Sequence, residues 1–410
     1  MSTQPKLIAA GRVVTCDPGR ATPQEPLGAI EQGAVLIEGS CLAQVGLAAD
    51  LLRQHPEAAR IEHPDGTLTP GLVDAHTHAA WVGSRAREYA MRMAGAGYEQ
   101  IAQAGGGIVA SMRAVRAASL DEMVRTLVAR LRRMAALGVT AVEVKSGYGL
   151  DEATERRQLE AVARAGEDAS LPRLVPTFLG LHALPPEAAG DRHGYARRCA
   201  EWIEGIARDG LARFADAYVD RGAFSAAQAR IVLARARELG LGVRLHAGQF
   251  ADVGAFELAA ELGAASVDHC EHLSEAAALQ LGEAGVRAAL LPVASFTLGQ
   301  APPPVETLRR AGVRLVVASD ANPGTAPTES LPLALALGVR SYGLSVAEAL
   351  LGATREAAAS LGLPTGVLRP GAPADLVLWD LPEESAIVQP WGVPRVRLVM
   401  REGRAIAQAS

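Results

Sequence analysis

The sequence predicts an α/β protein, a (β/α)8 TIM barrel with a small composite β-sandwich domain that is built from both termini. Three observations lead to this prediction. Through the middle of the chain, short apolar runs alternate with Ala-, Arg- and Glu-rich helical stretches, a pattern typical of parallel strands covered by helices. Eight such runs occur over roughly 250 residues, which is the size and repeat of a (β/α)8 barrel. The two ends carry short apolar runs punctuated by glycine, as strands and hairpins do.

The regions follow in order along the chain. Residues 1–68, with the runs LIAAGRVVT, GAVLIEG and CLAQVG, are expected to form the N-terminal part of the β-domain. The barrel is expected at 69–365, and 366–410, with GVLRPGAPADLVLWD and PRVRLVMREGRAI, is expected to complete the β-domain. The eight barrel strands are predicted at 72–78, 139–145, 173–182, 213–220, 242–248, 265–272, 287–296 and 313–322.

Composition narrows the class of protein. The 410 residues are 49% hydrophobic and 21% charged, which is enough apolar material for a large core and argues against a disordered chain. A net charge of -5 without blocks of like charge disfavours nucleic acid or an anionic membrane as the main partner. The four cysteines are scattered without a CxxC pair, and Gly11 and Arg12 interrupt the apolar N-terminus. With no apolar stretch long enough to span a bilayer, these features predict a cytoplasmic protein.

Polar residues lie at or near the C-terminal ends of the predicted strands, the face where barrel enzymes place their chemistry. His76 and His78 form an H-x-H pair whose rings point to the same side of the first strand. Burying two unpartnered imidazoles would cost about 1–3 kcal/mol each, and a metal ion removes that cost. His246 and Asp320 add a third nitrogen and a carboxylate, a set that suits Zn²⁺ or Fe²⁺. The alternative for Asp320 is a helix N-cap.

Three further residues leave more than one interpretation open. His269 ends strand 6 and is either another ligand or a base and electrophile beside the metal-bound water, whereas His272 is expected in a loop or behind the site. The chain has two lysines, Lys6 and Lys145. In two-metal barrels a carboxylated lysine on strand 4 bridges the ions, but Lys145 lies on strand 2. A single metal is therefore favoured, and Lys145 is expected to form an ion pair, with Glu143 as a candidate partner.

These residues lie in stretches that resemble the amidohydrolase superfamily, and within it the imidazolonepropionase family. The resemblance extends over most of residues 65–365, and its SGYGL and NPGT segments are far more specific than H-x-H. It also implies the composite β-domain. The resembling stretches are DAHTHAAWVGSRAREYAMRMAGAGYEQIAQAGGGI, VEVKSGYGL, TFLGLHALPPE, LHAGQFADVGAFELAAELGA, DHCEHL and SDANPGTAPTES.

The resemblance implies roles for individual positions. It makes His76, His78, His246 and Asp320 the metal ligands. Arg85, which is otherwise an ordinary loop arginine, would pair with a propionate carboxylate. Gly324 would let the backbone approach a ligand closely. Gly248 departs from the family, which usually has an acidic residue there. The remaining implied contacts to substrate or product are Tyr148, His182, Gln249 beside the reacting ring, Asn322 and Thr325, with Tyr98 assigned equally to packing or to substrate contact.

The activity that the resemblance implies is hydrolysis of 4-imidazolone-5-propanoate to N-formimidoyl-L-glutamate in histidine degradation. One divalent metal per chain, Zn or Fe, would activate a water. Asp320 would accept the proton of that water, His269 would help to stabilise the oxyanion, and the proton would pass to the departing ring nitrogen. The resemblance favours a homodimer. The alternatives are another amidohydrolase, acting on a purine or on formimidoylglutamate, and a non-catalytic relative that has lost its metal.

Overall fold

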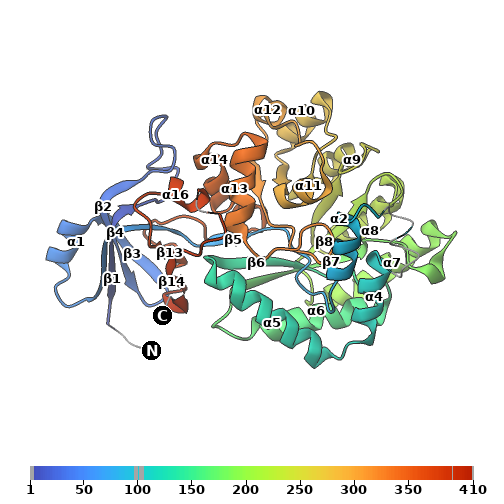
Figure 1. Cartoon of the computed structure of the whole chain (residues 1–410), viewed down its shortest axis with the longest axis horizontal. Helices are drawn as coiled ribbons and strands as arrows, with labels where there is room; N and C mark the ends of the chain where they lie inside the picture. The colour runs from blue at the N-terminus through green and yellow to red at the C-terminus, as the bar shows by residue number, and fades with distance from the viewer. Residues whose placement is uncertain (1–3, 97–99, 101–105, 390, 409–410) are drawn as a thin grey trace.

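The computed structural model of the chain describes residues 4–96, 100, 106–389 and 391–408. Two β-structures lie next to each other, an eight-stranded barrel wrapped by helices and a seven-stranded sheet that contains both ends of the chain (Figure 1). The predicted α/β class, the barrel and the β-unit shared by the two termini are confirmed.

The barrel strands are parallel and follow one another in chain order. Behind the last strand, a parallel bridge between Thr77 and Ala321 joins the segments that follow the first and eighth strands. A strand is found in each of the eight predicted ranges, but four of the predicted strands were too long. The first, sixth and eighth end at Asp74, His269 and Val317. The seventh ends at Leu290 because Pro292 begins a helix there. The strands are β5 (Leu72–Asp74), β6 (Val139–Lys145), β7 (Arg173–Leu181), β8 (Phe214–Val219), β9 (Gly242–Ala247), β10 (Ser266–His269), β11 (Arg287–Leu290) and β12 (Leu315–Val317).

Helices cover the outside of the barrel. In α5, residues Leu127, Leu131 and Met134 recur at helical spacing and are buried in the barrel core, each contributing about 1.5–3 kcal/mol. Ser225 and Gln228 form a capping box that fixes the start of α8. The helices are α2 (Ala86–Met93), α4 (Ile108–Ala117), α5 (Leu120–Ala136), α6 (Glu152–Gly166), α7 (Arg192–Arg208), α8 (Ala226–Glu238), α9 (Ala255–Leu262), α10 (Glu275–Ala284), α11 (Pro292–Leu298), α12 (Val305–Arg310), α13 (Leu331–Tyr342), α14 (Val346–Gly352) and α15 (Arg355–Ser360).

The terminal β-unit is one mixed sheet in the order β15-β14-β13-β4-β1-β2-β3. The edge strand β3 contacts the segment that leads into β13, because the Leu42 N–H donates to the Ala372 carbonyl at 2.9 Å, and strands from both ends of the chain share one apolar core. This curled sheet accounts for the predicted sandwich. Its elements are β1 (Lys6–Val13), β2 (Ile30–Glu38), β3 (Cys41–Leu47), α1 (Ala48–Gln54), β4 (Ala59–Pro70), β13 (Leu376–Trp379), α16 (Ser385–Val388), β14 (Val396–Arg401) and β15 (Arg404–Gln408).

Gly71 separates β4 of the sheet from β5 of the barrel. A Cβ atom at this position would lie 2.1 Å from Thr140 Oγ1, so the close passage beside β6 requires glycine. The first barrel strand, and with it the H-x-H pair, is thereby tied directly to the terminal sheet. Among the described helices, none combines the length and the hydropathy that crossing a membrane requires.

Candidate metal centre and active site

The four predicted ligands converge at the C-terminal end of the barrel. The rings of His76 and His78, which follow β5, have centroids 5.3 Å apart, as the period-two argument predicts. His246 Nε2, from the end of β9, lies 3.3 Å from His78 Nε2. Asp320 Oδ1 lies 3.5 Å from the Nε2 atoms of His76 and His78. One nitrogen of each of the three histidines falls within a common 4.8 Å, a spacing that a single metal ion can bridge.

Two buried carboxylates lie behind the rings of His76 and His246. His76 Nδ1 lies 2.6 Å from Asp268 Oδ2, and His246 Nδ1 lies 3.0 Å from Asp216 Oδ2. Carboxylates in this position orient metal-binding imidazoles and set their tautomer. His76 Nε2 is left buried and has no hydrogen-bond partner among the described residues. Burial holds the pKa of His76 and His78 well below the ordinary value, so both rings are neutral donors of the kind a divalent cation binds.

Beneath these carboxylates lies a buried charge network centred on Lys145. Its Nζ is 2.7 Å from Glu143 Oε1, 2.7 Å from Asp216 Oδ2 and 3.8 Å from Asp268 Oδ2. Arg244 lies 3.7 Å from both Glu143 and Asp268. Burial opposes the Lys145 charge, but Asp216 and Glu143 raise the pKa of Lys145 above its ordinary value. The predicted ion pair with Glu143 is confirmed, and the ammonium also pairs with Asp216 and lies near Asp268, the carboxylates behind His246 and His76.

His269 lies beside His76 and His246. Neighbouring residues of a regular strand point to opposite sides, and Asp268 already contacts His76. The φ of 84° at His269 turns the chain at the end of β10, so the His269 ring also faces the site. The ring centroid is 6.1 Å from His76 and 5.6 Å from His246. Burial lowers the pKa of His269 to about 3. His272 is exposed in the following loop.

Tyr148 and His182 flank the ligands on one side. The His182 ring stacks on His78 with centroids 4.8 Å apart, and Tyr148 meets His182 edge-on at 5.2 Å. His182 Nδ1 bonds to the Gly147 carbonyl at 2.8 Å, so Nδ1 carries the proton and Nε2 is left for another partner. Burial raises the pKa of Tyr148, which keeps its phenol a hydrogen-bond donor, and the charge of Arg85 acts on the same hydroxyl. The prediction for Tyr98 lies outside the described residues.

The loop after β12 is organised by Asn322. Its Oδ1 accepts hydrogen bonds from the N–H groups of Gly324, at 2.8 Å, and Thr325, at 2.7 Å, and its Nδ2 donates to the Asp320 carbonyl at 2.7 Å. Within the described structure, Gly324 makes a close approach to a side chain: a Cβ added there would lie 2.3 Å from Arg85 Nη1. The absence of a side chain at 324 therefore makes room for Arg85.

The conformation of the segment after β9 explains why glycine stands at 248, where the resemblance led us to expect an acidic residue. This residue has a φ of 65°, and a Cβ there would lie 2.6 Å from Phe256 Cζ. An acidic side chain at 248 would meet both obstacles. Next to it, Gln249 is buried and its Oε1 accepts a hydrogen bond from the Tyr218 hydroxyl at 2.9 Å.

Sequence reasoning missed the carboxylates Asp216 and Asp268 and the cation Arg244. A usable signal was present, since each is a charged residue inside a predicted buried strand. Asp216 interrupts FADAYV, Asp268 interrupts ASVDHCEH, and Arg244 precedes His246 by two residues and so shares its face.

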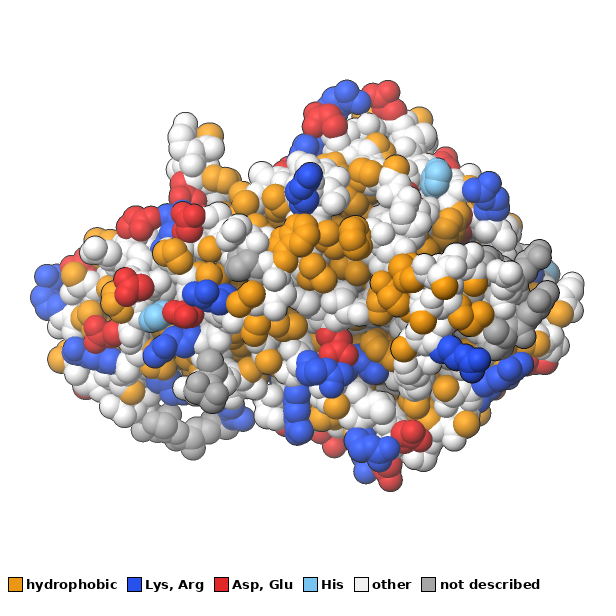
Figure 2. Space-filling view, viewed as in Figure 1, with side chains coloured by type: hydrophobic (Ala, Val, Ile, Leu, Met, Phe, Trp, Pro, Cys, Tyr) orange, Lys and Arg blue, Asp and Glu red, His pale blue; other side chains and the backbone are white. Residues whose placement is uncertain are grey.

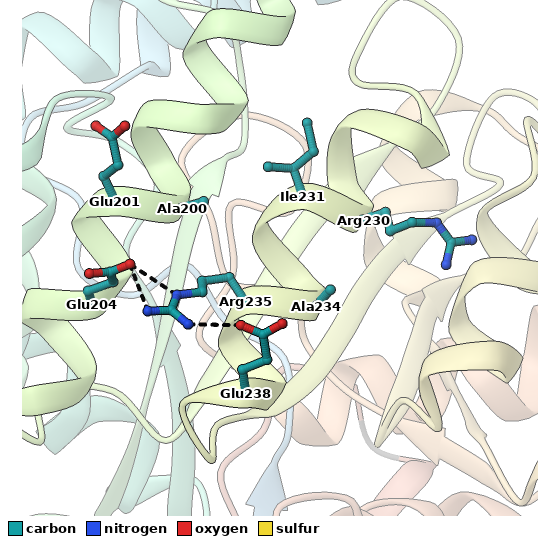
Figure 3. A pocket seen from close by; sticks show the side chains of 8 residues that line it. All are labelled: Ala200, Glu201, Glu204, Arg230, Ile231, Ala234, Arg235 and Glu238. Atoms are coloured by element: carbon teal, nitrogen blue, oxygen red, sulfur yellow. Dashed lines mark hydrogen bonds and ion pairs between the residues drawn. The ribbon is translucent and has the colours of Figure 1, made fainter.

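Two other hollows lie away from these residues. A surface groove of about 430 Å³ runs between α7 and α8, where Arg235 pairs with Glu204 and Glu238 (Figure 3). An apolar cavity of about 230 Å³ separates α13 from residues 381–396. None of the described residues that were predicted for the site lines either hollow.

The barrel, its composite β-unit and the three converging histidines define a class of metal-dependent hydrolases. The chain belongs to the amidohydrolase family, whose sequence model matches residues 67–406. Its relatives include imidazolonepropionases, among them one from Bradyrhizobium sp. (strain BTAi1) that is 44% identical over 373 residues, or 90% of this chain and 92% of the relative.

Solved structures share the fold at lower identity. A triazine hydrolase variant superposes with a TM-score of 0.77 at 19% identity, covering 98% of this chain and 95% of that one. A zinc-bound adenosine deaminase from Xanthomonas campestris has a TM-score of 0.70 at 22% identity, covering 97% and 92%. At these identities the likeness concerns the fold alone.

Proposed function

We propose that this protein hydrolyses the cyclic amide 4-imidazolone-5-propanoate to N-formimidoyl-L-glutamate in histidine degradation. The observation that carries the proposal is the buried cluster of His76, His78, His246 and Asp320, within a chain 44% identical to an imidazolonepropionase over nine-tenths of its length. The ring of Tyr148 lies 6.0 Å from that of His78, and the charge of Arg85 opposes the burial that raises the pKa of the Tyr148 hydroxyl. A cation near the histidine cluster suits a substrate that carries both a ring amide and a carboxylate.

His76, His78, His246 and Asp320 would hold one divalent cation, zinc or iron. Nitrogen-rich sites with one carboxylate suit either metal, and the orphaned His76 Nε2 fits such an ion. When bound, the cation lowers the pKa of a water and polarises a carbonyl. Lys145 already has two short ion pairs and is not available to bridge a second ion, so we propose a single metal per chain.

The side chains around the cluster would move one proton. Asp320 would accept it from the attacking water as the oxygen of that water bonds to the ring carbonyl carbon. The same proton would then pass to the ring nitrogen as the carbon–nitrogen bond breaks and the ring opens. His269, placed beside the ligands, would donate to the oxygen on which charge develops. Gln249, hydrogen-bonded to Tyr218, whose ring lies 5.6 Å from that of His246, would contact the reacting ring.

Arg85 would bind the propionate carboxylate, with Tyr148 and His182 as neighbouring donors. The loop that Asn322 organises, including Gly324 and Thr325, would face the carboxylate-bearing end of the product. Each of these roles is a prediction for the individual residue.

The test is turnover of freshly prepared 4-imidazolone-5-propanoate by the metal-loaded protein, with the formimidoyl product identified by mass spectrometry. Adenosine and N-formimidoyl-L-glutamate serve as comparison substrates. Hydrolysis of the imidazolone, and one zinc or iron per chain by elemental analysis, are the expected results. Turnover of a comparison substrate alone would overturn the function, and two tightly bound ions per chain would overturn the single-metal site.

The homodimer and the cytoplasmic location stay predictions. Figure 2 shows hydrophobic side chains gathered on the face where Figure 1 labels α13. On the neighbouring α11, Phe296 is strongly exposed. The four cysteines are unpaired thiols, three of them buried, which suits a reducing compartment. Light scattering on a size-exclusion column measures the oligomeric state, and a mass of one chain would contradict the dimer.

A further inference from the structure

Glu88 is a buried carboxylate that the reaction proposed above does not use. It lies on α2, on the loop side of the first barrel strand, and is 6% exposed. Its two oxygens accept hydrogen bonds from Arg85 Nε at 2.8 Å and Arg85 Nη2 at 2.5 Å. They also accept from Arg92 Nη2 at 2.9 Å and from the N–H of Gly107 at 2.7 Å. With these four hydrogen bonds, the Glu88 carboxylate is fixed in position and in turn fixes the side chains of Arg85 and Arg92.

The consequence for Arg85 is geometric. A guanidinium has two edges that can each bind a carboxylate with two parallel hydrogen bonds, Nε with Nη2 and Nη1 with Nη2. Glu88 occupies the first edge. On the second edge, Nη1 makes no hydrogen bond to a described residue, and it is the atom of Arg85 nearest to a hypothetical Cβ at Gly324. Arg85 therefore presents its second edge toward the loop after β12.

Arg85, Glu88 and Arg92 together carry one excess positive charge. Burial opposes ionisation of Glu88, but hydrogen bonds from Arg85 and Gly107 lower its pKa below the ordinary value, so it is an anion. By itself it would neutralise Arg85. Arg92, which also donates to the Gly324 carbonyl at 3.2 Å, restores a net positive charge at the same place. Two arginines and one glutamate thus match one additional carboxylate.

We propose that Glu88 is a positioning residue for substrate selection. Glu88 binds one edge of the Arg85 guanidinium, so that the other edge binds the side-chain carboxylate of the substrate. Arg92 keeps the net charge of the three side chains positive. The proposal rests on the proposed function, because it assumes a substrate whose ring carries a carboxylate side chain. Glu88 touches neither the metal ligands nor the reacting ring. Its loss is therefore expected to weaken recognition of the carboxylate and to leave the chemical step intact.

The experiment compares two substrates on Glu88→Gln and on the wild type. One substrate is 4-imidazolone-5-propanoate, and the other is its side-chain amide, which has the same ring and no charge. The ratio of the two kcat/KM values measures preference for the carboxylate. Glutamine keeps the shape of Glu88 but not its charge or its two acceptor oxygens. We expect the preference to fall by about tenfold or more through KM of the acid, with kcat within about threefold of the wild type.

Two further variants make the comparison decisive. Glu261→Gln is the matched control, because Glu261 forms a two-point pair with Arg230 on the surface between α8 and α9, and its preference should equal that of the wild type. In Gly324→Ala, the added Cβ would displace Arg85 while Glu88 stays intact. This variant should also lower the preference for the acid over the amide by about tenfold. If Glu88→Gln does not fold, as judged by circular dichroism, Glu88→Asp takes its place, because it keeps the charge and shortens the side chain that reaches Arg85.

The outcomes separate the two proposals. Wild-type protein that hydrolyses neither substrate contradicts the proposed function itself. Wild-type protein that prefers the acid, together with an unchanged preference in Glu88→Gln or in a folded Gly324→Ala, overturns the positioning role. An equal rise of KM for acid and amide overturns it as well, because general loosening of the loop acts on both substrates.

Discussion

Lys145 offers a direct test of the buried charge network. Replacing it with methionine keeps most of the side-chain volume and removes the ammonium that contacts Glu143 and Asp216 at 2.7 Å each. All three side chains are fully buried, so no water enters to replace the lost charge. Three carboxylates, with Asp268, would then face Arg244 alone, which lies 3.7 Å from Glu143 and Asp268.

The expected loss is about 3–5 kcal/mol in the free energy of unfolding, the usual cost of removing one partner from a buried ion pair. That is a large share of the roughly 5–15 kcal/mol that stabilises a typical protein. Lys145→Met combined with Glu143→Gln removes one anion together with the cation. The double variant should recover about half of the loss, because the excess negative charge is reduced while Asp216 keeps His246 as a partner.

Urea unfolding of chelator-treated protein, followed by tryptophan fluorescence, measures these differences through the transition midpoint. Lys6→Met is the control, because Lys6 Nζ donates to the Gly403 carbonyl and that contact is worth about 1 kcal/mol. A Lys145→Met protein no less stable than Lys6→Met would refute the reasoning. So would a double variant that is less stable than Lys145→Met, since the carboxylates would then not be in electrostatic conflict.

Three more substitutions test individual residues. Arg85→Ala should raise KM for the imidazolone acid by an amount equivalent to about 2–4 kcal/mol with little change in kcat, because the ion pair exists in both ground and transition states; steady-state kinetics with a wild-type KM would remove Arg85 from the site. His269→Gln should lower kcat by about 10²–10⁴ with metal content unchanged, as measured by kinetics and elemental analysis on one preparation. A loss of metal would instead make His269 a ligand. Gly248→Ala should destabilise the protein by about 2–4 kcal/mol, because the left-handed backbone and the contact with Phe256 both oppose a Cβ, and an unaltered melting temperature would contradict that account.

Much of the fold was predictable because it depends on local patterns. Each barrel strand is an apolar run bounded by turn or helix signals, and such a run specifies a strand wherever it lies. The H-x-H spacing also settles by itself that His76 and His78 share a side. The predicted strand at 287–296 was too long because an apolar run does not reveal its own end, and Pro292 starts α11 within it.

Backbone conformations that oppose ordinary preferences were not predictable. Asp320 and His269 have φ values of 53° and 84°, and although Asp and His adopt positive φ more often than most residues, they do so too rarely for the sequence to predict it. Alternation along β10 would turn His269 away from the side that Asp268 faces, yet both lie at the site. The surrounding structure must impose the turn, because the residue does not favour it.

The sequence by itself determined the barrel and the shared side of His76 and His78, since these follow from periodicity and spacing along a single segment. It also placed His246 and Asp320 near the C-terminal ends of other predicted strands, the end of the barrel where chemistry is expected. The tertiary structure decided which carboxylate stands behind each histidine and which edge of Arg85 is open. His76 and Asp268 are 192 residues apart, and Arg85 and Gly324 lie still farther apart along the chain. Contacts of this kind depend on how the strands close into a ring, and no local pattern encodes that distance.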